Sequence, residues 1–130
     1  MTIDIPQVLY IAVDNPNVTF SPPSENEFNA GTIAAANQTT LTYSGNVPHV
    51  VTIAADVASF TGPYAKAASD LEWSTDGTTW SPLSTLPVNV ASSAAPGRYT
   101  QVVWYRLILD YQQDAPGTYT LPITYSIVAN

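Results

Sequence analysis

Alternation of apolar and polar residues dominates the last third of the chain and predicts β-strands there. Two runs, residues 99–109 and 119–127, place apolar or aromatic side chains at nearly every second position. A period of two is typical of a strand with one buried face. Pro96-Gly97 and Pro116-Gly117 precede the two runs, and each pair predicts a type II turn, because proline fixes the first φ and glycine takes the positive second one. We therefore expect two long strands, the second over residues 118–128.

The same alternation marks residues 3–13 as a long strand. Pro6 lacks a backbone N–H, which restricts at least this part to the edge of a sheet. One interpretation makes this the first strand of its own domain. In the other, residues 1–13 form a donor strand that completes the sheet of a neighbouring subunit, because the chain offers nothing after its last predicted strand to pair with that strand. The apolar side chains that would enter the neighbour are Ile3, Ile5, Leu9, Ile11 and Val13.

Two hairpins are predicted in the middle of the chain. Residues 41–55 alternate on both sides of a Ser-Gly-Asn turn. Residues 71–82 alternate on both sides of Asp76-Gly77, a pair that suits a two-residue type I′ turn. Counting outward from this turn, Trp73 and Trp80 form a directly opposed cross-strand pair.

The chain as a whole predicts an all-β domain. A weaker strand is expected over residues 28–33, and no stretch shows the apolar period of an amphipathic helix. Counting all strands gives roughly eight to ten. We therefore expect residues 1–130 to form a single β-sandwich of the immunoglobulin-like or jelly-roll type, with no significant helix.

Composition narrows the classes of partner. Three basic residues stand against ten acidic ones, for a formal net charge of −7. Nucleic acid and anionic membranes need a basic face, so neither is expected to bind. The chain has no cysteine, which excludes disulfides and thiolate metal sites, and it has no apolar run long enough to cross a bilayer. It opens without the features of a signal peptide, so either an export signal has been removed or the protein is not exported by that route.

Catalytic and metal-binding patterns are weak. His49 is the only histidine, and no nucleophile motif accompanies it, so the sequence favours an ordinary strand histidine over a catalytic base. The oxygen-rich turn at residues 14–17 could bind calcium, and Glu25 and Glu27 could serve as a glycosidase pair, but a solvated turn and a plain loop are favoured. We therefore expect no enzyme activity, no catalytic or metal-binding residue and no cofactor.

The chain has one lysine, Lys66, in a predicted irregular loop over residues 61–70. As the only lysine, Lys66 could form an intramolecular isopeptide bond with an asparagine side chain. The sequence does not favour such a bond.

Aromatic residues suggest a binding surface. Trp104 is out of phase with the tyrosines and leucines of its strand, so we expect it on the outer face beside Arg106, where a cation–aromatic contact can form. An exposed tryptophan strip indicates an interface with a protein partner or, as the alternative, a stacking platform for sugar rings. The candidate residues for this platform are Trp73, Trp80 and Trp104.

Residues 114–120, Asp-Ala-Pro-Gly-Thr-Tyr-Thr, look like the tyrosine corner of immunoglobulin-like domains, with Asp114, Gly117 and Tyr119 in the structural positions. The ending from Gly117 also resembles the last strand of spore-coat-U-like proteins and archaic pilins, and residues 42–48 are similar to their middle hairpin. The chain departs from relatives of that group in lacking cysteines and paired Trp-x-Leu motifs. The resemblance implies a non-enzymatic extracellular subunit that polymerises by lending a strand to its neighbour.

We therefore expect a structural subunit of an extracellular filament, pilus or surface layer, located at the cell surface. Its main partner would be further copies of itself, with surface glycans as a second class of partner and no insertion into a membrane. Two alternatives remain open. One is a carbohydrate-binding β-sandwich module, and the other is a structural protein of a virion or phage tail, located in the virion.

Overall fold

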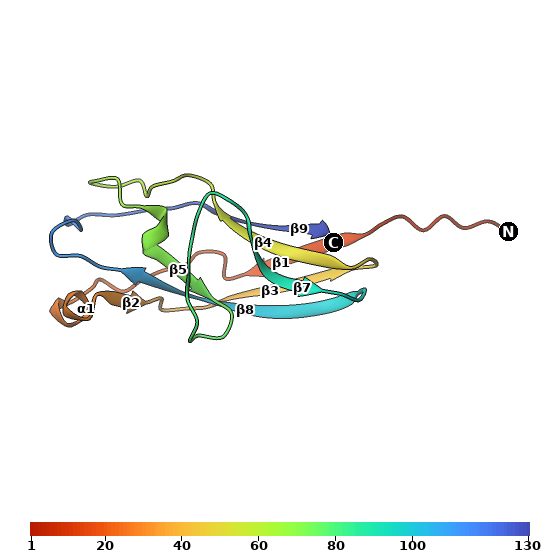
Figure 1. Ribbon diagram of the computed structural model, residues 1–130, viewed down its shortest axis with the longest axis horizontal. Coiled ribbons are helices and arrows are strands. Elements are labelled where there is room, and N and C mark those ends of the chain that lie inside the picture. Colours follow the sequence, from red (N-terminus) through yellow and green to blue (C-terminus); the bar gives the residue numbers. More distant parts are fainter.

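The computed structural model describes residues 1–130 as two antiparallel sheets packed face to face (Figure 1). The larger sheet has the strand order β1-β3-β8-β5-β6, with β2 also paired to β8, and the smaller sheet has the order β7-β4-β9. This architecture confirms the all-β sandwich, and its nine strands fall within the predicted number. The elements are β1 (Leu9–Asp14), α1 (Glu25–Ala30), β2 (Thr32–Ala34), β3 (Thr39–Gly45), β4 (His49–Ala55), the 3-10 turn η1 (Ala68–Asp70), β5 (Leu71–Ser74), β6 (Ser81–Pro82), β7 (Val88–Ser93), β8 (Gly97–Ile108) and β9 (Ile123–Ala129).

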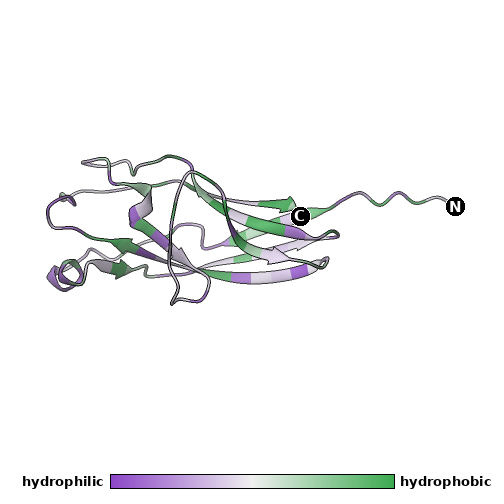
Figure 2. Cartoon of the chain, viewed as in Figure 1, coloured by the Kyte–Doolittle hydropathy of each residue, from purple (hydrophilic) through white to green (hydrophobic).

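A single hydrophobic core lies between the sheets. Figure 2 shows apolar residues along β4 and at the end of β9, whereas the short helix α1 is largely hydrophilic. Burying apolar surface between two sheets is the main force that holds such a sandwich together. The core cluster consists of Leu41, Tyr43, Val51, Ile53, Ala55, Ala68, Leu71, Trp73, Leu83, Val90, Val103 and Tyr105.

β8 is the central strand of the larger sheet, and the prediction for it is confirmed. It pairs with β3 along its first half and with β5 along its second half. Val103 and Tyr105 are buried in the core, while Trp104 and Arg106 alternate with them and are only partly buried. The period of two therefore identified both the strand and its buried face.

The predicted hairpin over residues 41–55 is wrong. β3 pairs with β1 and β8 in the larger sheet, whereas β4 pairs with β7 and β9 in the smaller one. The turn after Gly45 therefore carries the chain from one sheet to the other. Tyr43 and Val51 then enter the core from opposite layers. Alternation alone cannot separate the two arrangements, because a hairpin and a connection between sheets give the same pattern.

The two-residue hairpin at Asp76-Gly77 is also wrong. β5 and β6 are paired, but Trp73 lies opposite Ser81, so six residues connect the strands. The Asp76 carboxylate organises this longer loop by accepting the backbone N–H groups of Thr78 and Thr79, each at 2.8 Å. The Thr79 and Thr78 N–H groups and the Ser74 hydroxyl hold the pKa of Asp76 well below its usual range. Because aspartate can bond its own loop in this way, it competes with the tight turn.

The strand predicted over residues 28–33 is wrong for its first part, where the helix α1 ends. Ser24 precedes the helix and its hydroxyl donates to the Glu27 carboxylate. Gly31 ends it with a φ of +83°, and its N–H donates to the carbonyl oxygens of Glu27 and Phe28. Serine followed three residues later by glutamate, with glycine after the last turn, is a recognised pair of helix-end signals. These signals were present in the sequence, but the short helix has no apolar period to reveal it.

The last strand is shorter than predicted. β9 begins at Ile123 rather than at residue 118, and before it only Thr120 pairs, in an isolated bridge with Thr61. Pro122 lies directly before β9 and cannot donate to a ladder. The chain over residues 115–122 is therefore mostly outside both sheets.

Candidate functional site

Residues 1–8 extend away from the sandwich as a tail (Figure 1). Ile3 and Ile5 are 71% and 80% exposed. Leu9, Ile11 and Val13 instead lie in β1 and pair with β3 of the same chain, where all three are half-buried. The five residues expected to act together are therefore divided between a free tail and the first strand of the domain.

The base of the tail is held by the side chain of Asn46. Its Oδ1 accepts the N–H of Val8 at 2.8 Å, and its Nδ2 donates to the carbonyl oxygen of Pro6 at 2.8 Å. The backbone N–H of Asn46 also donates to the carbonyl oxygen of Val8 at 3.2 Å. The side-chain amide of Asn46 thus bonds the tail backbone as a residue of a neighbouring strand would. The tail therefore leaves the sheet in line with β1.

A hollow of about 490 Å³, lined by hydrophobic side chains and by polar residues such as Asn17 and Thr120, lies between the chain after β1 and the chain before β9. We call this the seam. Val18 and Phe20 line it on one side, and Leu121 and Ile123 line it on the other, all of them half-buried. β1 ends at Asp14 and β9 begins only at residue 123, so neither sheet has an edge strand over this stretch.

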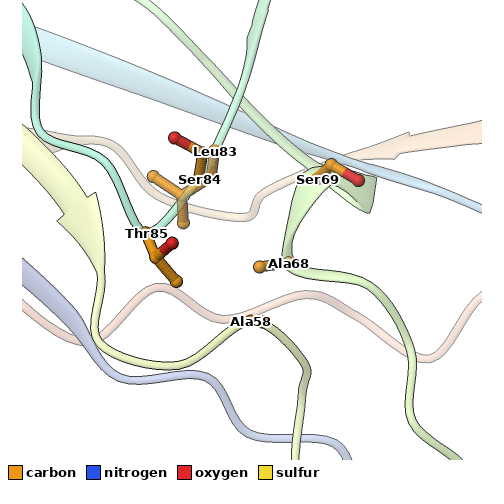
Figure 3. Close-up of a pocket in the computed structure, with 6 residues that line it drawn as sticks. All are labelled: Ala58, Ala68, Ser69, Leu83, Ser84 and Thr85. Carbon is orange, nitrogen blue, oxygen red and sulfur yellow. The ribbon is translucent and has the colours of Figure 1, made fainter.

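A second hollow, of about 190 Å³, is smaller and has no acid–base group on its wall. Figure 3 shows it between the segment around Ala58, the 3-10 turn η1 and the chain after β6. Hydroxyl and methyl groups provide most of its lining, which gives it no group to bind a charged ligand strongly. The lining residues are Ala58, Ala68, Ser69, Leu83, Ser84 and Thr85.

The two Pro-Gly pairs open two similar corners. The Tyr119 hydroxyl donates to the carbonyl oxygen of Ala115 at 2.6 Å, and the Tyr99 hydroxyl donates to that of Ala95 at 3.0 Å. The glycines have a φ of +152° at residue 117 and +158° at residue 97, whereas the third residue of a type II turn has a φ near +80°. The predicted turn type is therefore wrong, although the φ is positive as expected.

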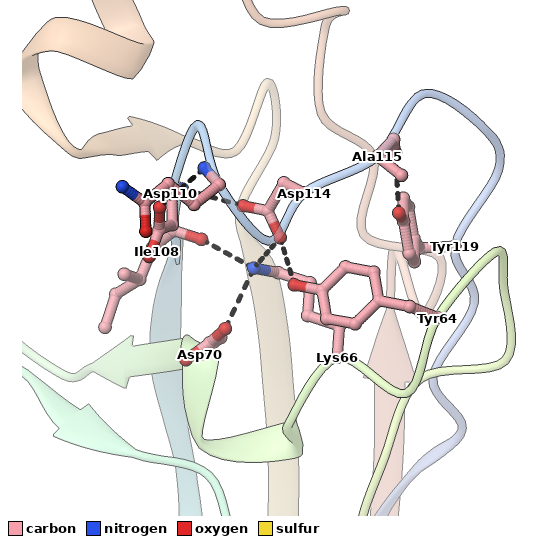
Figure 4. A network of polar contacts seen from close by, with 9 residues as sticks. Tyr64, Lys66, Asp70, Ile108, Asp110, Asp114, Ala115 and Tyr119 are labelled. Atoms are coloured by element: carbon pink, nitrogen blue, oxygen red, sulfur yellow. Dashed lines mark hydrogen bonds and ion pairs between the residues drawn. The ribbon is translucent and has the colours of Figure 1, made fainter.

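Lys66 is the centre of a polar cluster that joins two loops (Figure 4). Its side chain is only 2% exposed, and its Nζ donates to Asp114 Oδ1 at 2.8 Å, to Asp70 Oδ2 at 2.9 Å and to the Ile108 carbonyl oxygen at 2.8 Å. The Tyr64 hydroxyl donates to the same Asp114 oxygen. We call these residues the lysine cluster. Sequence reasoning missed this cluster, because its members are up to 50 residues apart.

Burial and hydrogen bonds within the lysine cluster shift the pKa values of Asp114 and Tyr64. Burial raises the pKa of Asp114, but hydrogen bonds from Lys66 and Tyr64 outweigh this effect and hold the pKa below its usual range. Burial, together with the hydrogen bond to Asp114, raises the pKa of Tyr64. The carboxyl group of Asp114 is therefore held in its ionised form beside the Nζ of Lys66.

The three tryptophans do not form one surface. Trp73 is buried in the core, so it cannot offer a face to a ligand. The Arg106 guanidinium lies 4.7 Å from the ring centroid of Trp80 and bonds Glu72 at 2.6 Å. Trp104 lies opposite Ser74 and is half-buried. The cation–aromatic contact expected at Trp104 is thus formed with Trp80 instead.

His49 lies in the core with no nucleophile bonded to it. Its side chain is fully buried, its Nδ1 is 2.8 Å from the carbonyl oxygen of Val47, and its Nε2 has no hydrogen-bond partner. The ring packs against those of Tyr43 and Tyr99, both within 6 Å between centroids. The structure gathers no group of three His, Cys, Asp or Glu side chains that could hold a metal ion.

Comparison of the chain with models of known protein families, with curated proteins and with solved structures found no match. None of the helices in the structure has the length and apolar character needed to span a membrane.

Proposed function

We propose that this protein is a structural subunit that assembles with further copies of itself, the tail of one copy filling the seam of the next. The observation that carries the proposal is the tail itself, where most of the surface of Ile3 and Ile5 is exposed. Apolar side chains that lie together on an exposed surface mark interaction sites in soluble proteins. Burying these two side chains together with Val8 would contribute about 6 kcal/mol, at about 2 kcal/mol each.

The seam has the properties of an acceptor for such a tail. Its walls carry apolar side chains at Val18, Phe20 and Leu121. Its volume is above the roughly 300 Å³ at which ligand pockets begin, so it can take up more than one aliphatic side chain. The neighbouring backbone is only partly paired, because Thr120 makes a single bridge there. An incoming strand could therefore gain main-chain hydrogen bonds as well as apolar contacts.

The positions of tail and seam favour an open chain of subunits. The tail leaves β1 at Leu9, and the seam begins beyond Asp14, at the other end of the same strand. A contact between two different surfaces of one molecule is heterologous, and it produces a filament unless the rotation closes it into a ring. The tail is long enough to enter a neighbour, since eight extended residues span about 26 Å.

Location at a cell surface, in a pilus or surface layer, belongs to this proposal, and a virion or phage tail is the alternative location. Low charge supports either, because only 10% of the residues are charged and neutral hydrogen-bonding groups supply most of the polarity. Labelling with an antibody on intact source cells and on purified particles distinguishes the two.

Removal of residues 1–8 tests the assembly. The deletion spares β1, so the variant should keep the fold, shown by an unchanged circular dichroism spectrum. We expect the full chain to form species whose mass rises with concentration in sedimentation velocity, and the shortened chain to remain a monomer. A synthetic peptide of residues 1–8 should bind the shortened chain. A full chain that stays a compact monomer at every concentration would refute the proposal.

A pair of double variants separates apolar contact from charge. Ile3→Asp with Ile5→Asp should abolish assembly, because two carboxylates cannot enter an apolar seam. Thr2→Asp with Gln7→Asp adds the same charge at other positions and should largely preserve it. Because the protein has no cysteine, Ile5→Cys and Val18→Cys on different copies provide a direct test, with a disulfide between copies as the expected product. Equal loss in both double variants would argue for a charge effect and against the seam.

A further inference from the structure

The lysine cluster places an amine against a carboxylate in a buried site, which is the arrangement needed for an amide bond. Lys66 Nζ lies 2.8 Å from one oxygen of Asp114, and the two side chains are 2% and 7% exposed. Figure 4 shows both side chains pointing toward one another from different loops. The structure changes the expectation drawn from the sequence, since the neighbours of Lys66 are two aspartates and not an asparagine.

We propose that Lys66 and Asp114 are the site of an intramolecular isopeptide bond, formed by condensation after the chain has folded. A proton first passes from the ammonium to the carboxylate, giving an amine and a carboxylic acid. The Nζ lone pair then attacks the Asp114 Cγ. The resulting tetrahedral carbon loses its hydroxyl group as water, and an Nζ–Cγ amide remains. One water is released, no oxidant or reductant is required, and the net charge of the pair is unchanged.

Asp70 is placed to move protons in this reaction. Its Oδ2 accepts a hydrogen bond from Nζ at 2.9 Å, so it can take the second proton from the attacking nitrogen and pass it to the departing hydroxyl. It is 27% exposed, which leaves it in contact with solvent on one side. Asp70 is therefore proposed as the catalytic residue, acting as general base and then general acid.

Fixed geometry favours the condensation, although the ion pair is the stable form at rest. Burial by itself disfavours the charged form of each group, so it opposes the hydrogen bonds that keep Asp114 ionised. Two reacting groups held in contact also gain an effective molarity of about 10⁵ M or more. Only one event per molecule is needed, so a slow reaction suffices.

Intact-mass spectrometry of the denatured protein tests the bond. The wild-type chain should be lighter than its sequence by the mass of one water, and a digest should contain a branched peptide that joins Lys66 to Asp114. Lys66→Arg and Asp114→Ala should both show the full mass. Asp70→Asn keeps the two reacting groups and should also show the full mass, or reach the lighter mass at least ten times more slowly.

One other reaction could release water from this chain, and the design separates it. Asp76-Gly77 can close to a succinimide, which has the same mass deficit. A deficit that persists in Lys66→Arg and disappears in Asp76→Glu would assign it to that loop and overturn the proposal. A full wild-type mass after several days in the folded state would overturn it as well. Circular dichroism spectra of each variant show that a full mass does not merely reflect failure to fold.

Discussion

The corners at Tyr99 and Tyr119 have similar local sequences and the same kind of hydrogen bond, but they pack against different parts of the protein. Each follows a Pro-Gly pair, and each tyrosine hydroxyl donates to the carbonyl oxygen four residues earlier. The first corner opens β8, and its ring stacks on Tyr43 at 5.8 Å. The ring of Tyr119 instead meets that of Tyr64 edge-on at 5.8 Å, in the loop that carries Lys66. The local motif therefore forms the corner, while the surrounding packing determines which segments each corner connects.

The space around the two glycines shows the same difference. The nearest atoms that a Cβ at Gly97 would meet belong to the side chain of Tyr99 in its own corner, at 3.1 Å or more. A Cβ at Gly117 would overlap Pro63, and one at Gly62 would come within 2.5 Å of Tyr119. The second corner is thus locked against the 61–66 loop. We infer that substitutions there should cost more stability than the same substitutions in the first corner.

The largest expected effect is the loss of the lysine that anchors the second corner. Lys66→Met should lower the free energy of unfolding by about 3 kcal/mol or more, because it leaves the carboxylates of Asp70 and Asp114 in a buried site without a cation. Urea denaturation measures the change. Arg98→Met, an exposed cation beside the first corner, is the matched control and should change stability by less than about 0.5 kcal/mol. Equal effects would mean that the lysine cluster contributes nothing to the anchor.

Valine at the two glycines should give the next largest difference. Gly117→Val should destabilise the protein by about 2 to 4 kcal/mol, because it adds overlap with Pro63 to the strain of a positive φ. Gly97→Val has the strain without the overlap, and about 1 kcal/mol is expected. Thermal and urea unfolding of both variants provide the comparison. A larger loss at residue 97 would contradict the locked second corner.

Removal of the two corner hydroxyls should have the smallest effect. Tyr119→Phe should cost about 1 kcal/mol, the usual contribution of one hydrogen bond, and Tyr99→Phe no more than that. The bond of Tyr119 is shorter, at 2.6 Å against 3.0 Å, and its ring is packed against a second loop. Urea midpoints measured under one set of conditions are sufficient to rank the two. No loss from either variant would mean that the backbone holds the corners without the hydroxyls.

Sequence patterns identified the strands better than their partners. The period of two revealed β8 and its buried face, because Val103 and Tyr105 alternate with half-buried residues. It could not show that β3 and β4 belong to different sheets, since both arrangements bury the same positions. The Asp76 loop was missed because a side chain that bonds its own backbone replaces the tight turn.

The same holds for the candidate sites, which sequence patterns revealed only in part. Alternation marked residues 3–13, but not the point at which the tail ends and β1 begins, which depends on the bonds of Asn46 to Pro6 and Val8. Sequence patterns could not predict the lysine cluster, because a single lysine and scattered aspartates form no periodic pattern. Only the fold shows that Lys66 lies against Asp114, 48 residues further along the chain.

The in-line exit of the tail has a mechanical consequence. Six consecutive residues of β1 pair with β3, and hydrogen bonds in an antiparallel ladder are perpendicular to the strands. A pull on the tail along β1 would load all of these bonds in shear at the same time, whereas a pull across the sheet would open them one by one. The amide of Asn46 lies first in line and shares that load. The pairing of β1 with β3 therefore resists tension along the tail better than tension across the sheet.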